Sequence, residues 1–178
     1  MTDHAGRPLL FLDVDGTLLP YGGKRLPSAS EEGDGWQELS NPQLAKIDRT
    51  HGPRLRELPC DLRWATAWME DANEVIAPLL GLPALPVVDL PEAEEDAAGL
   101  LHWKTRALVR VAAGRPFIWV DDEITDRDRA WVSGHHEGLA LLHRVDPGIG
   151  LTEADFAVLD DWLRDIPGAR SRQRPEAG

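Results

Sequence analysis

Short apolar runs that end in acidic or hydroxyl residues alternate with amphipathic segments along this chain. A bounded run of four to eight apolar residues is typical of a buried strand, whereas apolar residues three and four positions apart are typical of a helix. Strands that alternate with helices are joined by crossover connections, which place parallel strands in one sheet with helices on both faces. The alternation therefore predicts a three-layer α/β/α sandwich built on a mainly parallel sheet.

The expected elements follow from this pattern. Five strands are expected, at residues 7–14, 61–66, 84–90, 115–122 and 138–145. Helices are expected at residues 50–59, 69–81, 100–114, 125–135 and 152–166, with Asp71 capping the second of these helices and Gly81 ending it. A chain of 178 residues is long enough for one core, so residues 1–166 are expected to form a single domain. Residues 20–41 are expected to form a flap or lid loop, and residues 167–178 a flexible tail.

Charge and cysteine content exclude several classes of protein. The net charge of −12 argues against a broad nucleic-acid surface, which needs many lysine and arginine side chains on one face. Cys60 is the single cysteine, so neither a disulfide within the chain nor a cysteine-based zinc site is expected. Neither a signal peptide nor a membrane span is apparent, so we expect a cytoplasmic protein that does not bind membranes.

Two aspartates at the end of the first apolar run indicate a metal site. Asp13 and Asp15 are two residues apart, which places both side chains on one face of an extended backbone. Gly16 then allows a sharp turn, and Thr17 can bond locally within it. Two neighbouring carboxylates repel each other, and Mg²⁺ relieves the repulsion because it prefers oxygen ligands and commonly binds carboxylates together with substrate phosphate. The segment "VDDEITD", at residues 120–126, adds oxygens at another strand end.

Four segments, in order, resemble the motifs of the haloacid dehalogenase (HAD) superfamily. "FLDVDGTLL" is similar to the first motif, Thr66 in "LRWATAW" to the second, Lys104 in "LHWKTRAL" to the third, and "IWVDDEITD" to the fourth acidic motif. The resemblance covers residues 8 to about 145 and implies a Rossmann-like fold. Within the superfamily, "WATAWMEDAN" and "WVDDE" look most similar to small HAD domains grouped with so-called Swiss-army-knife RNA-repair proteins.

The resemblance implies a magnesium-dependent phosphatase that acts through an aspartyl-phosphate. Asp13 would be the nucleophile, and Asp15 the general acid and base. Thr66 and Lys104 would hold the phosphoryl oxygens, and Lys104 would also offset the charge of Asp13.

The resemblance also implies how Mg²⁺ would be held. Its ligands would be the carboxylate of Asp13, the main-chain carbonyl of Asp15, and an acidic residue of the pair Asp121 and Asp122. The fourth motif leaves the ligand open, because Asp122 can be read with Asp121 or with Asp126, which could equally cap the following helix. We favour Asp122 as the main ligand, supported by Asp121.

The residues beside the motifs are the expected substrate-binding residues, namely Gly16, Thr17, Ala67 and Trp68. For Trp68, packing in the core is the alternative interpretation. In the HAD superfamily a cap inserted after the first or second motif selects the substrate. Fifty residues separate Asp15 from Thr66, and 37 separate Thr66 from Lys104, which leaves no room for a large cap. We therefore expect an open site whose partner is a phosphorylated small molecule or macromolecular end.

Other functions remain open from the sequence. A 3′- or 5′-end phosphatase acting on nucleic acid is a variant of the same chemistry. A HAD-like domain that binds a partner without catalysis is a second alternative. A signalling receiver domain uses similar residues, but its acidic pair follows the first strand and its phosphorylated aspartate follows a later one, which does not fit Asp13 and Asp15.

Overall fold

The computed structural model describes residues 6–22, 42–92 and 100–167. Residues 23–41 of the expected lid therefore lie outside the described residues. The same holds for residues 168–178 of the expected tail. In the described part of the chain, no helix is long and apolar enough to cross a membrane.

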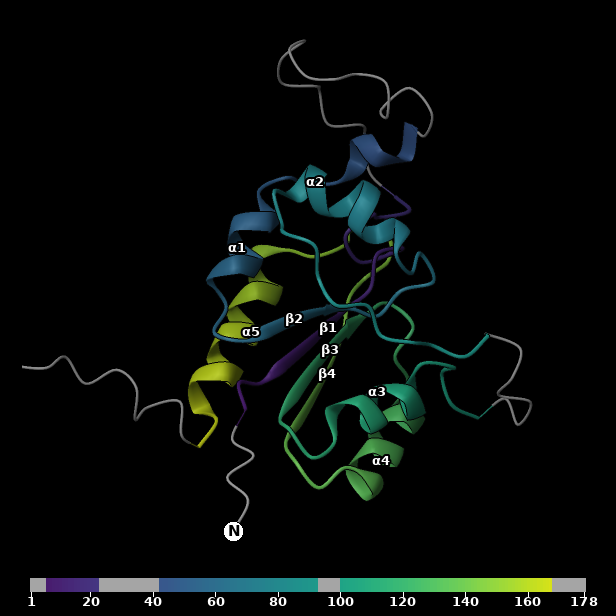
Figure 1. Ribbon diagram of the computed structural model, residues 1–178, viewed down its shortest axis with the longest axis vertical. Helices are drawn as coiled ribbons and strands as arrows, with labels where there is room; N and C mark the ends of the chain where they lie inside the picture. The colour runs from purple at the N-terminus through teal and green to yellow at the C-terminus, as the bar shows by residue number, and fades with distance from the viewer. Residues whose placement is uncertain (1–5, 23–41, 93–99, 168–178) are drawn as a thin grey trace, which may run out of the picture.

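The described residues form a four-stranded parallel sheet with helices on both faces (Figure 1). The strands are β1 (Leu9–Leu12), β2 (Asp61–Trp64), β3 (Phe117–Asp121) and β4 (Ala140–Arg144). The α-helices are α1 (His51–Glu57), α2 (Ala77–Leu80), α3 (Thr105–Ala112), α4 (Asp126–His135) and α5 (Glu153–Asp165). A 3₁₀-helix, η1 (Pro42–Lys46), precedes α1, and a π-helical turn, η2 (Ala72–Ile76), leads into α2.

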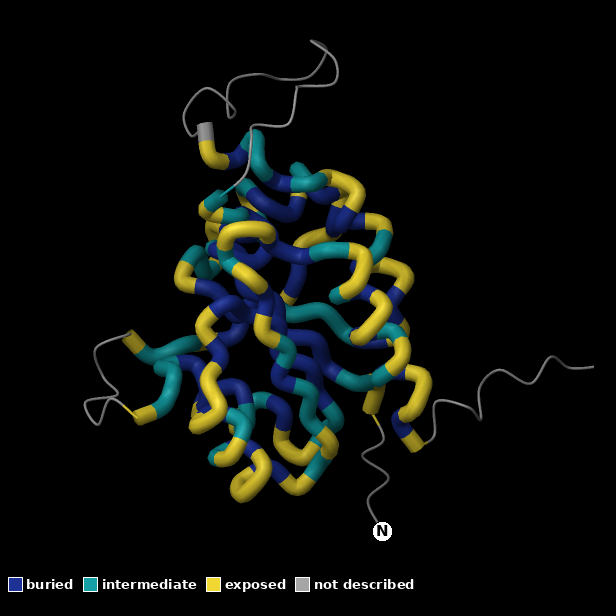
Figure 2. The backbone as a smooth tube through the Cα atoms, turned by 180° about the vertical axis from the view of Figure 1, so that it is seen from behind, coloured by how far each residue is buried: buried dark blue, intermediate teal, exposed yellow. Residues whose placement is uncertain are grey.

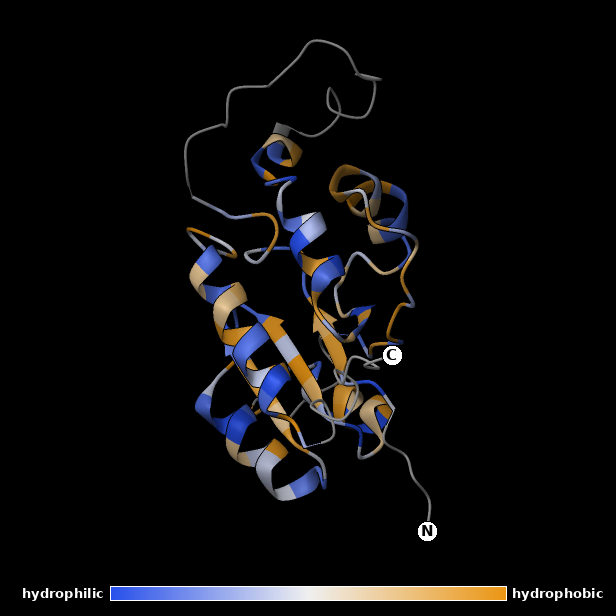
Figure 3. Cartoon of the chain, turned by 90° about the vertical axis from the view of Figure 1, so that its left-hand side faces the viewer, coloured by the Kyte–Doolittle hydropathy of each residue, from blue (hydrophilic) through white to orange (hydrophobic). Residues whose placement is uncertain are grey.

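Alternate residues of the central strands enter two separate cores. Leu10 and Leu12 of β1 belong to the core under α1, α2 and α5, whereas Leu9 and Phe11 belong to the core under α3 and α4. Figure 2 shows the buried backbone at the centre of the molecule, and Figure 3 shows mostly hydrophobic strands between helices that carry both hydrophilic and hydrophobic residues. Because the side chains of a strand alternate between its faces, a continuous apolar run serves both cores at once. The α/β sandwich predicted from the alternation is confirmed at this level.

The expectation of five strands is not met among the described residues. The segment expected as a strand at 84–90 forms only one parallel bridge, between Val87 and Trp64 at the outer edge of β2. The N–H of Trp64 donates to Pro86 O and the N–H of Val88 donates to Trp64 O, both at 2.9 Å. Pro86 has no N–H and Pro83 stands three residues earlier, so the segment cannot extend the ladder toward its N-terminal end as a regular strand would.

The helix expected at residues 69–81 is shorter and less regular in the structure than the spacing of its apolar residues predicts. It consists of the π-helical turn η2 followed by α2. Asp71 precedes η2 but makes no capping bond with its side chain, so the expected cap is wrong. Gly81 ends α2 with a φ of 65°, a left-handed conformation that glycine adopts without strain, so the expected stop is confirmed.

Gly52 lets α1 approach α2 closely, and we expect Gly52→Ala to destabilise the protein by about 1–3 kcal/mol. A Cβ at this position would lie 1.7 Å from the carbonyl oxygen of Leu80, so the backbone would have to move. Gly134 in α4 is the matched control, because a Cβ there meets no atom within 4 Å. Gly134→Ala should stabilise the protein by up to about 1 kcal/mol. Urea denaturation measures both, and equal effects would contradict the close approach.

Candidate functional site

Parallel pairing brings three of the expected site residues to one edge of the sheet. Asp13 directly follows β1, and its N–H donates to Val120 O in β3 at 3.1 Å. Asp121 is the last residue of β3 and therefore lies at the same level. On the other side of β1, the N–H of Ala65 donates to Leu12 O at 2.9 Å, which places Thr66 one residue further along. Ligands of parallel sheets bind beyond this carboxyl edge.

Lys104 links the two strand ends. It lies at the N-terminal boundary of α3, and its Nζ donates to Asp13 Oδ1 at 2.8 Å and to Asp121 Oδ2 at 2.7 Å. All three side chains are buried. Burial alone would lower the pKa of Lys104, but the charges of Asp13 and Asp121 outweigh it and the pKa is raised. The lysine is therefore a fixed positive charge shared between two carboxylates.

Asp122 completes a group of three carboxylates. Oxygens of Asp13, Asp121 and Asp122 all lie within 4.8 Å of one another, and each of the three residues is buried. Burial raises the pKa of Asp13 to about 7 and, reinforced by Asp121, raises that of Asp122 to about 6. Lys104 supplies one positive charge for three carboxylates, so the group retains a negative charge that a proton or a cation can balance.

The turn after Asp13 packs against the third carboxylate. Gly16 has a φ of 75°, and a Cβ there would lie 2.4 Å from Asp122 Oδ2, so glycine is required for both conformation and space. The buried hydroxyl of Thr17 lies 3.5 Å from Asp13 Oδ2. On the far side of Asp122, the Nε of Arg144 donates to its main-chain oxygen at 3.0 Å.

Asp15 is not part of this group of three, and its carboxylate is bound by Trp68. The indole Nε1 of Trp68 donates to Asp15 Oδ2 at 3.0 Å, which joins the loop after β1 to the loop after β2. The N–H of Trp68 donates to Thr66 Oγ1 at 3.2 Å, which leaves the hydroxyl hydrogen of Thr66 to donate elsewhere. Trp68 also packs against the core, as the alternative interpretation of this residue expected, and its role in binding a substrate stays a prediction. Ala67 between them is exposed.

Asp126 lies apart from the other acidic residues. It is the first residue of α4, its side chain is 99% exposed, and its Oδ1 accepts from Arg129 at 2.8 Å. Asp122, by contrast, lies with Asp13. The structure therefore does not bring Asp126 into the group with Asp122, and which acidic residue binds a metal ion stays a prediction.

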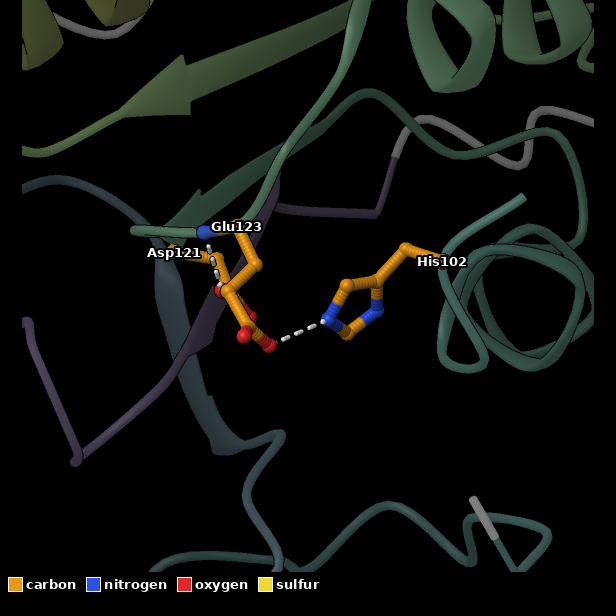
Figure 4. A group of neighbouring side chains, drawn as sticks. All are labelled: His102, Asp121 and Glu123. Carbon is orange, nitrogen blue, oxygen red and sulfur yellow. Dashed lines mark hydrogen bonds and ion pairs between the residues drawn. The ribbon is translucent and has the colours of Figure 1, made fainter. Parts of the chain in front are cut away.

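A second group of possible metal ligands consists of His102, Asp121 and Glu123. Figure 4 shows the imidazole of His102 and the carboxylate of Glu123 pointing toward each other, with 3.2 Å between Nε2 and Oε2. The N–H of Lys104 donates to His102 Nδ1 at 3.2 Å, so the ring proton stands on Nε2 and faces Glu123. Both ring nitrogens are thereby occupied, and this group does not suit a metal ion.

A hollow of about 490 Å³ opens beside this histidine. Its lining includes His102 and Glu123 together with the exposed Leu100 and residues at the start of α4. The N–H of Glu123 donates to Asp121 Oδ1 at 3.0 Å, so the hollow adjoins the buried carboxylates through one residue.

Some residues around the site were not found by sequence reasoning. Tyr21 is largely exposed, but the partial burial of its phenol group raises its pKa, and the negative charges of Asp122, Asp15 and Asp13 raise it further. These charges place Tyr21 near the acidic group. Asp128 is a second such residue. A threonine at position 125 with an acidic residue three positions later is the pattern of a capping box, so a local signal for Asp128 did exist. For Tyr21 no local pattern existed.

Comparison with protein-family models, with curated proteins and with solved structures finds no match to this chain.

Proposed function

We propose that this protein is a magnesium-dependent phosphomonoester hydrolase that acts through an aspartyl-phosphate. One observation carries the proposal: the ammonium group of Lys104 joins Asp13 and Asp121, which come from two neighbouring strands, beside the buried carboxylate of Asp122. Phosphoryl transfer depends mainly on positioning and on neutralising oxygen charge, and this group supplies a carboxylate nucleophile beside a fixed cation.

The residues present account for both steps of the reaction. In the first step, a carboxylate oxygen of Asp13 bonds to phosphorus, the bond to the leaving oxygen breaks, and that oxygen takes a proton from Asp15. In the second step, water gives a proton to Asp15 and bonds to phosphorus, which releases phosphate and regenerates the Asp13 carboxylate. The indole of Trp68 holds one oxygen of Asp15 and leaves the other for the proton.

Two groups face the charge that develops on the phosphoryl oxygens. Lys104 lies against the nucleophile, and its ammonium group can donate to a phosphoryl oxygen as well. Thr66 keeps a hydroxyl hydrogen for the same purpose, because its oxygen accepts from the main chain of Trp68. The hollow beside His102 and Glu123 gives room for the leaving group of the substrate.

The carboxylates suit a magnesium ion. Oxygens of Asp13 and Asp122 lie close enough to hold one ion, and the main-chain carbonyl of Asp15, which the resemblance adds, would complete the all-oxygen donor set that Mg²⁺ prefers. Asp121 is engaged by Lys104 and by the indole of Trp119, so it supports the site through Lys104. When bound, the ion would neutralise charge on the phosphoryl oxygens.

We expect millimolar Mg²⁺ to raise the melting temperature of the protein, because the ion relieves repulsion among buried carboxylates in the folded state only. Asp122→Asn should remove this increase, while Asp126→Asn, which changes an exposed carboxylate, should retain it. Differential scanning fluorimetry with and without Mg²⁺ measures the shift. An undiminished shift in Asp122→Asn would place the ion elsewhere.

A panel of phosphate esters tests the function itself. We expect Mg²⁺-dependent release of phosphate from at least one of 4-nitrophenyl phosphate, nucleotides, sugar phosphates, phosphopeptides and end-phosphorylated oligonucleotides. Excess EDTA should stop the release, and added Mg²⁺ should restore it. Absence of release from every substrate, with the fold intact and Mg²⁺ bound, would contradict the proposal and favour a binding role.

A further inference from the structure

The helices α4 and α5 begin with the same capping box. At α4, the N–H and hydroxyl of Thr125 donate to Asp128 Oδ2 at 2.9 and 2.7 Å, and the N–H of Asp128 donates back to the threonine oxygen. At α5, Thr152 and Asp155 repeat the arrangement at 2.7 and 2.8 Å. In both boxes the threonine occupies Oδ2 of the aspartate, which leaves Oδ1 to bond outside the box.

The remaining oxygen distinguishes the two aspartates. Asp155 Oδ1 meets the ring of His143 at 2.8 Å. Asp128 Oδ1 accepts from the N–H of His102 at 2.8 Å and from the hydroxyl of Thr105 at 2.7 Å. Asp128 is fully buried, and these hydrogen bonds outweigh burial and lower its pKa, so it is a carboxylate with four donors.

The two partners of Asp128 Oδ1 lie on either side of Lys104 in the chain. The main chain of Lys104 is held as well, because its N–H donates to His102 Nδ1. Asp128 therefore fixes the turn at residues 102–105, while Oδ2 of the same carboxylate fixes Thr125 at the end of the acidic loop that begins at Asp121. One buried carboxylate thus joins the segment that carries the lysine to the segment that carries two of the acidic residues.

We propose that Asp128 is a positioning residue that holds the ammonium group of Lys104 against Asp13 and Asp121. Its effect on turnover rests on the proposed phosphatase function, whereas its effect on the position of Lys104 does not. The substitution Asp128→Asn isolates this role, because whichever way the amide is turned its NH₂ group faces a main-chain N–H, which can only donate, and a threonine hydroxyl that gives up its bond to the carboxylate. Asp155→Asn is the matched control, since it alters the equivalent box at α5.

The rate of lysine acetylation measures whether the amine of Lys104 stays in its buried position. The chain has three lysines, Lys24, Lys46 and Lys104, and only the exposed amines should react readily with acetic anhydride. We measure acetylation of Lys104 relative to Lys46 by mass spectrometry of the folded protein. The ratio should be low in the native protein and in Asp155→Asn, and should rise roughly tenfold or more in Asp128→Asn, since losing buried hydrogen bonds favours local opening. An equal ratio in the two variants would overturn the proposal.

Turnover gives the second readout. Asp128→Asn should lower kcat by roughly 10- to 100-fold, because a catalytic group displaced by about 1 Å loses that much, with a smaller change in KM. Asp155→Asn should leave kcat within about twofold of the native value. Unchanged kcat in Asp128→Asn, in a protein that turns over its substrate, would also overturn the proposal.

Variants of Thr105 keep the test valid if Asp128→Asn fails to fold. Thr105→Val removes one donor to Asp128 and leaves the capping box intact, so it should raise Lys104 acetylation and lower kcat. Thr105→Ser retains the hydroxyl and should restore both. Identical acetylation ratios in the two Thr105 variants would contradict the role of Asp128. If the native protein releases no phosphate, the proposed function fails, and acetylation alone decides whether Asp128 positions Lys104.

Discussion

Replacing Asp13 by asparagine is expected to reduce phosphate release by at least about a thousandfold, because the amide oxygen is a far weaker nucleophile than a carboxylate. The substitution is nearly isosteric, and the amide still has an oxygen to accept from Lys104. The protein should therefore fold, and the loss should appear in kcat. Steady-state assays on the best substrate of the panel measure the change, and circular dichroism checks the fold.

Asp126→Asn is the control for this experiment. It makes the same chemical change at a carboxylate of the acidic motif that is 99% exposed and pairs with Arg129. Its kcat should stay within about twofold of the native value, as expected for a surface substitution. A variant Asp13→Asn that keeps more than a tenth of the native rate would exclude an aspartyl-phosphate on this residue.

Lys104→Met is expected to destabilise the protein by about 3–5 kcal/mol at pH 8 in the absence of Mg²⁺, because it leaves buried carboxylates without their cation. Methionine has a similar length, so the effect comes mainly from the lost charge. The loss should shrink as pH falls. Burial already raises the pKa of Asp13 to about 7, and without the ammonium group this pKa would be higher still, so the group protonates and needs no counter-charge. Urea denaturation at pH 8 and pH 6 measures the difference.

Two further variants isolate the charge effect. Lys46→Met changes a lysine whose ammonium group donates to the main-chain oxygen of Tyr21 near the surface, and it should alter stability by less than about 0.5 kcal/mol. The double variant Lys104→Met with Asp121→Asn should recover part of the lost stability, because it removes one of the uncompensated charges. A double variant less stable than Lys104→Met alone would show that Asp121 does not depend on the lysine for its charge balance.

The apolar runs of the sequence were sufficient to predict the strands that lie inside the sheet. β1 and β3 are buried on both faces, so β1 is apolar throughout and β3 is apolar up to its last residue, Asp121, and such runs are recognisable without any knowledge of neighbours. The segment at 84–90 has a similar composition, yet its prolines limit it to one bridge at the sheet edge. Whether a short apolar segment forms a strand there depends on its partner as well as its own residues.

The expected site residues likewise divide into those that the sequence could locate and those whose contacts depend on the tertiary structure. Asp13 and Asp121 could be placed at strand ends from the sequence, because each follows an apolar run directly, and Thr66 because it ends the short segment "DLRWAT" that was expected to be a strand. That Lys104 reaches Asp13 and Asp121, and that Asp126 faces solvent, depends on how α3 and α4 pack on the sheet. Asp128 lies in a recognisable capping box, but its bonds to the turn before α3 involve residues more than twenty positions away.

The sequence by itself determined where the four strands of the central sheet lie and which polar residues follow them, because side-chain alternation and strand length are local properties, but it did not distinguish these strands from the segment at 84–90. Only the tertiary structure decided that Asp13 lies beside Asp121, and that one ammonium group joins them. The physical reason is that strand register and helix packing arise from contacts between residues far apart in the chain. In a parallel sheet, shifting the register by one residue would move every side chain of a strand to the opposite face.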